Sequence, residues 1–160
     1  MDKMGKNPTA RTRLKKPDNK ILKHMATAGY SGTPLLKKLG LKEGQKIWLF
    51  DPPGDYFRLL DADISSWVCG RGECPDWVHL FAPNVRAFER GMRSLAAVIR
   101  KNPRIVIWVS WYKKSSGMAT DLTEDVIRGY ALSNGLVDIK VCAVSEQWSG
   151  LKLVVPLDKR

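Results

Sequence analysis

Two hydrophobic patterns alternate along this chain. Short apolar runs, rich in β-branched and aromatic residues, predict strands buried on both faces at 46–50, 76–81 and 105–110. Between the second and third runs, apolar residues recur every three or four positions from Val85 to Lys101, which predicts an amphipathic helix. Strands and helices that alternate in this way are typical of a parallel sheet with helices packed on both faces.

Local signals predict where further helices begin and end. Thr33 as N-cap and Pro34 as the first helical residue predict a short helix that stops at Gly40. Asp121, followed three positions later by Glu124, forms an acidic variant of the capping box and predicts the start of another helix. The residues expected on the inner face of that helix are Leu122, Val126, Ile127 and Tyr130.

The remaining segments complete the predicted fold. We expect a helix at 19–28, a helical stretch at 56–60, a weak strand at 64–69 and two final strands at 138–144 and 150–155. The link between the final strands is too short for a helical crossover, so the two strands are predicted to form an antiparallel hairpin. The fold class is therefore α/β: three layers, Rossmann-like, with a mostly parallel sheet that ends in a hairpin as methyltransferases do.

The positive charge of the chain is concentrated near its start. The net charge is +11, and residues 1–30 hold eight basic residues against two acidic ones. We expect residues 1–28 to form a basic, flexible arm and residues 29–160 to form a single α/β domain. Basic side chains can hold nucleic acid electrostatically, and the candidates in the arm are Arg11, Arg13, Lys15 and Lys16. A solubilising tail is the favoured interpretation, because the arm lacks aromatic residues before Tyr30 that could stack on bases.

No apolar run has the length of a membrane span, and the first thirty residues lack the apolar core of a secretory signal. A cytoplasmic protein without a membrane partner is the expectation. Three cysteines, Cys69, Cys74 and Cys142, fit reduced thiols rather than a disulfide framework. The spacing of Cys69, Cys74 and His79 matches no common zinc finger, so a core histidine is favoured at position 79 and no metal site is predicted.

The carboxyl ends of parallel strands share one edge of a sheet, where ligands bind in open α/β folds. Polar and aromatic residues follow each predicted strand and are expected to converge there. The candidate ligand-binding residues are Asp51, Asp55, Tyr56, Asn84, Ser110, Trp111, Lys113 and Lys114. The alternative is that Trp111 plugs the sheet edge and that the two lysines belong to a solvated turn. Trp148, in the final hairpin, is predicted to pack across the sheet rather than to meet a partner.

Common catalytic motifs are not visible. Ser110 ends a predicted strand, but no base can be placed beside it from the sequence, and no catalytic residue is assigned. A methyltransferase would need a glycine-rich turn after the first strand and an acid after the second. The turn that follows the first strand has two prolines and one glycine, at 52–54, and the weak second strand ends without an acid. Binding of S-adenosylmethionine is therefore a secondary hypothesis, and no cofactor is assured.

Six blocks of the sequence, at 29–35, 38–40, 108–114, 120–126, 135–144 and 148–152, occur in one order along the chain. Together they resemble a family of small bacterial α/β proteins known as domain of unknown function 3052. The resemblance covers roughly residues 29 to 155 and implies a compact bacterial, cytosolic domain.

The function hypothesis is a binding or regulatory module without catalysis. Its ligand would be a small anion, a nucleotide or an acidic protein partner at the carboxyl edge of the sheet. One alternative is a divergent S-adenosylmethionine-dependent methyltransferase. The other is a nucleic-acid-associated protein that uses the basic arm.

Overall fold

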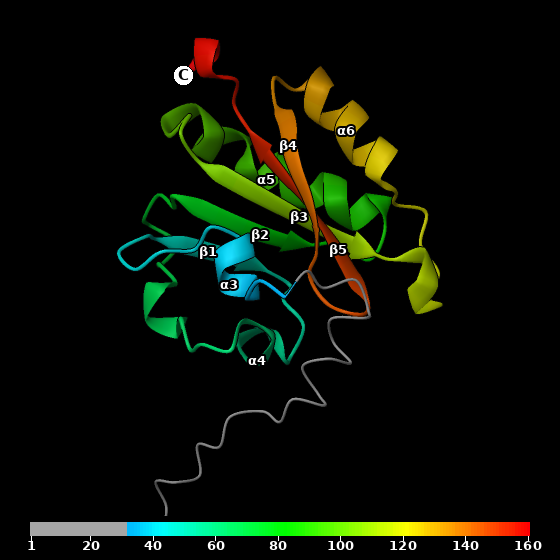
Figure 1. The fold of residues 1–160 in the computed structure, drawn as a ribbon. Coiled ribbons are helices and arrows are strands. Elements are labelled where there is room, and N and C mark those ends of the chain that lie inside the picture. Colours follow the sequence, from blue (N-terminus) through cyan, green and yellow to red (C-terminus); the bar gives the residue numbers. More distant parts are fainter. Residues whose placement is uncertain (1–31) are drawn as a thin grey trace, which may run out of the picture.

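Five strands form one sheet in the order β1-β2-β3-β5-β4 (Figure 1). The computed structural model describes residues 32–160; the predicted arm, with Arg11, Arg13, Lys15 and Lys16, and the predicted helix at 19–28 lie outside the described residues. The strands are β1 (Ile47–Phe50), β2 (Trp77–Phe81), β3 (Val106–Tyr112), β4 (Val137–Ala143) and β5 (Trp148–Val154). The helices are α3 (Leu35–Lys38), α4 (Tyr56–Leu60), α5 (Val85–Lys101) and α6 (Glu124–Ser133), with short 3-10 turns η2 (Ser65–Trp67), η3 (Lys114–Ser116) and η4 (Leu157–Lys159).

The pairing of the strands confirms the predicted fold class. Strands β1, β2 and β3 run parallel to one another. The pairing of β1 with β2 begins where Ile47 lies opposite Trp77. Strand β5 is antiparallel to both β3 and β4 and lies between them. Four of the five strands therefore point the same way, and the chain ends in the predicted hairpin, whose second strand is inserted into the sheet. This is a Rossmann-like α/β arrangement.

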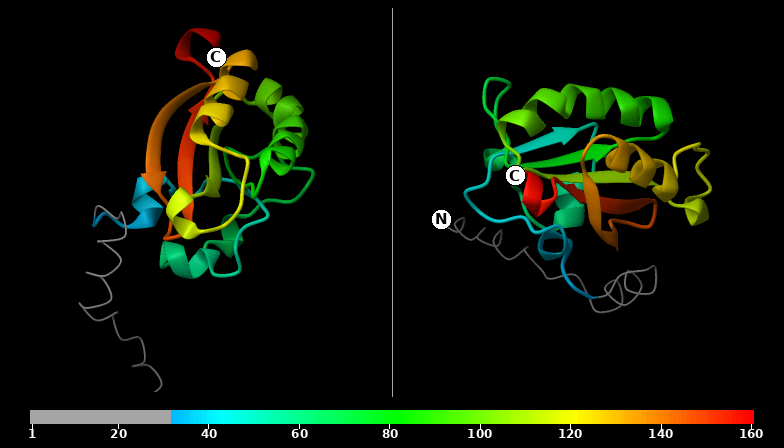
Figure 2. Two further views of the ribbon diagram at one scale, coloured as in Figure 1. Left: turned by 90° about the vertical axis from the view of Figure 1, so that its right-hand side faces the viewer. Right: turned by 90° about the horizontal axis from the view of Figure 1, so that it is seen from above.

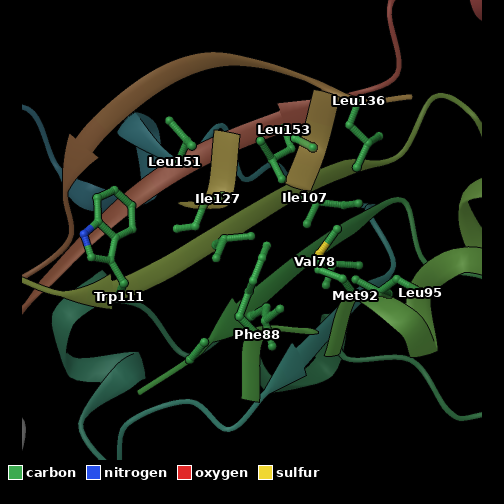
Figure 3. Packing of buried hydrophobic residues seen from close by; sticks show 14 of the residues in the cluster. Val78, Phe88, Met92, Leu95, Ile107, Trp111, Ile127, Leu136, Leu151 and Leu153 are labelled. Carbon is green, nitrogen blue, oxygen red and sulfur yellow. The ribbon is translucent and has the colours of Figure 1, made fainter. Parts of the chain in front are cut away.

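One face of the sheet packs against the long helices α5 and α6. Figure 2 shows α5 running over one side of the sheet, with α3 on the opposite side. The core on the α5 side gathers apolar side chains from β2, β3, β5 and both helices, including Val78, Phe88, Ile107, Ile127 and Leu151 (Figure 3). Helix α5 follows the apolar stripe predicted from the sequence, and Asn84 caps it by accepting a hydrogen bond from the Ala87 amide at 2.9 Å.

Helix α5 approaches the sheet closely at Gly91. A Cβ atom placed on Gly91 would lie 2.7 Å from the Cδ1 atom of Leu80 on β2. Only a residue without a side chain fits at that distance, so Gly91 sets the spacing between the helix and the sheet.

The other face of the sheet packs against α3, α4 and the chain around Ile64. The carbonyl that follows α3 accepts hydrogen bonds from two strands. The indole nitrogens of Trp77, on β2, and Trp108, on β3, each donate a hydrogen bond of 3.0 Å to the Leu39 carbonyl oxygen. Gly40 follows with a φ of 70°, the left-handed conformation that ends a helix. Two neighbouring strands thus fix the end of a four-residue helix.

Several boundary predictions were wrong. Segment 64–69 is not a strand: the Asp63 carboxylate accepts a hydrogen bond from the Ser65 amide at the start of η2, and Val68 makes only an isolated bridge to Ile47. Helix α3 is capped by Pro34 rather than by Thr33. No helix among residues 32–160 combines the length and the apolar composition that a membrane crossing requires.

The start of α6 also differs from the prediction. Thr123, not Asp121, caps the helix by accepting a hydrogen bond from the Val126 amide at 3.2 Å. Asp121 instead accepts a hydrogen bond of 2.8 Å from the Val85 amide, and so joins the beginnings of α6 and α5. Val126, predicted on the inner face, is exposed, and Ala131 takes a place in the core.

Candidate functional site

The eight predicted ligand-binding residues do not converge on one site. Ser110 and Trp111, adjacent on β3, enter the cores on opposite faces of the sheet, because successive side chains of a strand alternate. Trp111 is 8% exposed and packs in the core that includes residues of α5 and α6 (Figure 3). Asn84 acts as the cap of α5, and Asp55 occupies the cap position of α4 without a side-chain hydrogen bond to that helix.

Two of the eight, Tyr56 and Ser110, are joined by His79 in a buried chain of hydrogen bonds. The hydroxyl of Tyr56 lies 2.8 Å from the Nδ1 atom of His79, and the Oγ atom of Ser110 lies 2.7 Å from its Nε2 atom. The sequence offered no means of placing a base beside Ser110, and the structure places His79 there. The chain of hydrogen bonds can run in either direction, and in both directions each ring nitrogen has a partner. His79 is thus the satisfied core histidine that the sequence favoured.

The environment of the hydrogen-bonded residues Tyr56, His79 and Ser110 opposes catalysis. His79 and Ser110 are each 0% exposed, so a substrate has no access to the serine hydroxyl. Burial lowers the pKa of His79 to about 3, which makes the imidazole a poor proton acceptor at neutral pH. Burial also raises the pKa of Tyr56 well above its usual range and keeps the phenol protonated. A buried polar network of this kind specifies how α4, β2 and β3 pack.

A hollow of about 700 Å³ lies beyond the carboxyl end of β3, and we call it the β3-end hollow. Trp111, Lys113 and Lys114 of the predicted set line it, together with Ser115, Thr120, Leu122, Thr123, Glu124, Asp125, Arg128, Tyr112 and Ser149. Arg128 pairs with Glu124 and Asp125 on its own helix and with Asp138 at 2.9 Å. Since Arg128 neutralises these carboxylates in part, the two lysines give this edge of the hollow its positive character.

A smaller hollow of about 360 Å³ lies between the carboxyl ends of β1 and β3. Asp51, at the end of β1, and Arg90, on α5, line it together with Tyr112 and Trp148. The rings of Tyr112 and Trp148 stack with centroids 4.2 Å apart, and Trp148 is 7% exposed, so the predicted packing of Trp148 across the sheet is confirmed. Asp51 has a φ of 50°, an uncommon conformation for a residue other than glycine.

A third hollow, of about 630 Å³, contains none of the ligand-binding residues predicted from the sequence, and we call it the lysine hollow. Its lining consists of Thr33, Lys37, Lys38, Lys140, Val141, Cys142, Ala143 and Ser149. Lysines from the last turn of α3 meet a lysine from β4, and the Nζ atom of Lys140 donates a hydrogen bond of 3.1 Å to the Lys38 carbonyl. These residues are 102 positions apart in the chain. No sequence signal places them together, because both helix-end lysines and strand lysines are ordinary surface features.

The described residues do not build a metal site. No group of three or more His, Cys, Asp or Glu side chains in residues 32–160 is close enough to hold a metal ion. Both nitrogens of His79 are engaged in hydrogen bonds, and Cys69, Cys74 and Cys142 are unpaired thiols that differ in exposure, from exposed Cys74 to buried Cys142.

The residues after β1 do not fit S-adenosylmethionine. That cofactor needs backbone N–H groups from a glycine-rich turn and an acid at the end of the next strand. Pro52 and Pro53 bring no N–H groups to the turn. The segment predicted as the next strand, 64–69, is mainly a 3-10 turn, so an acid has no strand end to occupy there.

Comparison with known proteins adds little to this description. No protein-family model matches the chain and no curated protein matches it, so the resemblance to domain of unknown function 3052 stays a prediction. Among solved structures, the chain is similar to a protein in the NADB-Rossmann superfamily from Streptococcus agalactiae. The TM-score is 0.43, with 8% sequence identity, and the match covers 77% of this chain and 68% of that chain. The fold assignment therefore rests on the order and pairing of the strands.

Proposed function

We propose that this protein is a binding or regulatory module that holds a small anionic ligand in the β3-end hollow. The observation that carries the proposal is the presence of Lys113 and Lys114 in a hollow at the carboxyl edge of the sheet, beside the hydroxyl groups of Ser115, Thr120 and Thr123. Ammonium and hydroxyl donors together suit an anion. The edge at which they stand is where open α/β sheets bind their ligands.

The buried polar network supports the absence of catalysis in this proposal. The serine and histidine that resemble a nucleophile and its base are enclosed in the core, while the side chains of the β3-end hollow include no such pair. Trp111 forms part of the wall of the hollow, and since it is largely buried it supplies shape rather than an open ring for stacking.

Thermal unfolding of the full chain tests this function. The panel consists of adenosine monophosphate, nicotinamide nucleotides, S-adenosylmethionine, S-adenosylhomocysteine and inorganic anions at matched ionic strength. A ligand at a hundred times its Kd adds about 2.7 kcal/mol to the free energy of unfolding, a clearly visible rise in Tm. We expect an anion to give this rise, and we expect Lys114→Gln to reduce it while Lys101→Gln, another exposed lysine at the end of α5, leaves it unchanged. A flat response to every anion would contradict the proposal, and a response to S-adenosylmethionine alone would favour the methyltransferase alternative.

A further inference from the structure

The outer face of helix α5 carries four arginines, Arg86, Arg90, Arg93 and Arg100, which we call the arginine row. All four residues are exposed, and α5 forms the outer layer on its side of the sheet (Figure 2). Positions seven apart return to nearly the same side of a helix, so Arg86, Arg93 and Arg100 follow one another along one line. Leu95, near the centre of the buried face, is separated from Arg86 by about two and a half turns. The row therefore lies opposite the core and extends about 21 Å along the helix.

Acidic side chains do not balance the arginine row. Within residues 32–160, no arginine of the row forms an ion pair. Glu89 is the sole acidic residue of α5, against five basic ones. At the start of the helix, the carboxylate of Asp121 accepts a hydrogen bond from the Val85 amide instead. Arg90 also lines the smaller hollow that contains Asp51, without pairing with it. Since like charges repel, a row without counter-charges favours the approach of an anion.

The type of cation in the row favours phosphate groups as its partners. The chain has 16 lysines and 11 arginines, yet α5 contains four arginines and a single lysine. For solubility alone either residue would serve, because both carry their charge at neutral pH. A guanidinium group presents paired N–H donors that match two oxygens of one phosphate, whereas an ammonium group acts as a point charge. Arginines repeated along a line therefore suit a ligand that repeats its phosphates.

We infer that the arginine row binds the phosphate backbone of double-stranded DNA. Each strand of a duplex carries one phosphate per about 3.4 Å of the helix axis, so a row about 21 Å long can reach several of them. Between the arginines, the small exposed residues Ser94 and Ala97 allow a close approach. Contacts of this kind position a protein on DNA without reading its sequence.

Other nucleic acids fit the row less well. Binding of single strands depends on aromatic side chains that stack on the bases, and Phe88, the aromatic residue of α5, is buried in the core. The major groove of B-form DNA is wide enough to admit an α-helix, whereas that of double-stranded RNA is deep and narrow. A straight helix that presents arginines and small residues thus suits the DNA duplex.

The test uses the full chain and a fluorescently labelled DNA duplex of mixed sequence. Fluorescence anisotropy at several sodium chloride concentrations gives Kd and its dependence on salt. The natural sequence is compared with the row variant Arg86→Gln/Arg93→Gln/Arg100→Gln and with the control Lys42→Gln/Arg58→Gln/Arg71→Gln. The control removes the same charge from exposed positions outside α5, and glutamine preserves helix propensity in the row variant.

Each phosphate contact contributes about 0.9 to the slope of log K against log salt concentration. We therefore expect the row variant to lower that slope by about 2.7. Its binding at low salt should weaken at least tenfold, while the control should change Kd less than twofold. Amide resonances of α5 should shift when the duplex is added to the natural sequence, and those of α4 should not.

Other outcomes would overturn the inference. The absence of binding at low salt would remove the site, and equal losses in both triple variants would show a diffuse effect of net charge. A single strand or an RNA duplex that binds more tightly than the DNA duplex would replace DNA as the ligand. Polyglutamate that displaces the duplex at equal charge concentration would instead indicate an acidic protein partner.

This inference and the proposed function can fail separately, because no residue of the arginine row lines the β3-end hollow. Lys114→Gln should change the Kd for the duplex less than twofold. The row variant should retain the rise in Tm that a small anion gives in the natural sequence.

Discussion

The Nε2 atom of His79 lies 2.7 Å from the Oγ atom of Ser110, between two neighbouring parallel strands and without exposure to solvent. The two residues are 31 positions apart in the chain. Their pairing satisfies a ring nitrogen that would otherwise stand unpartnered, in a ring that lies against those of Trp77 and Phe81. The arrangement has the residue types of a catalytic pair but the surroundings of a structural one.

Removing the hydroxyl group of Ser110 should destabilise the fold. In Ser110→Ala, the Nε2 atom of His79 loses its partner while it stays buried, at a cost of about 1–3 kcal/mol. Urea unfolding measures the loss. Ser115→Ala, at an exposed position in η3, serves as the control and should change stability by less than about 0.5 kcal/mol. Labelling of Ser110 in the folded protein by a fluorophosphonate probe would show instead that the serine is accessible and reactive.

The histidine should make stability depend on pH below neutrality. Burial lowers the pKa of His79 in the folded state from 6.5 to about 3, so the unfolded chain binds the proton more strongly. The contribution of His79 is fully present above about pH 6.5 and is lost as the pH falls toward 3, at up to about 1.4 kcal/mol per pH unit. Between pH 7 and pH 5.5, urea unfolding should show a loss of about 1 kcal/mol.

The control for this pH dependence uses the second histidine. His79→Gln should remove the loss between pH 7 and pH 5.5, although the variant is less stable at both values. His24→Gln should retain the loss at full size. If the loss of stability between pH 7 and pH 5.5 persists in His79→Gln, it arises from carboxylates rather than from the buried ring.

The two helical glycines Gly91 and Gly129 should respond oppositely to alanine. A Cβ atom on Gly91 would lie 2.7 and 2.8 Å from the two Cδ atoms of Leu80, which is itself buried in the core. Gly91→Ala should therefore lower stability by about 1–3 kcal/mol. A Cβ atom on Gly129 in α6 meets nothing within 4 Å, so Gly129→Ala should raise stability by up to about 1 kcal/mol through helix propensity. Thermal unfolding of both variants would refute this if the two changes had the same sign.

The repulsion between Lys140 and Lys152 should be measurable without a ligand. Lys152→Gln removes one of two like charges that face each other across β4 and β5, and should raise stability by about 0.2–1 kcal/mol at low salt. The gain should shrink in about 1 M sodium chloride, where the Debye length falls to about 3 Å. Chemical unfolding at both salt concentrations provides the measurement, and a gain independent of salt would point to packing instead of charge.

The sequence was informative wherever a structural signal is local. Helices α4 and α5 have the predicted bounds, because a proline-glycine turn precedes the first and an apolar stripe defines the second. The sequence was misleading at 64–69. There the Asp63 carboxylate stabilises a turn within a segment whose apolar residues resemble a strand. The caps of α3 and α6 lie one and two residues from their predicted positions, since neighbouring threonine, proline and aspartate residues are all plausible caps.

The contrast between what the sequence predicts and what the tertiary structure decides is stronger in the candidate site. The alternation of hydrophobic patterns determined the α/β class, the parallel strands and the edge at which Lys113 and Lys114 stand. Tertiary structure alone decided that Ser110 faces His79 while its neighbour Trp111 faces the opposite core, and that Lys38 meets Lys140. Periodicity along a chain specifies the secondary structure and the buried face of each element. Which side chains meet across that face depends on the register between strands and the placement of helices, and only the folded packing sets those.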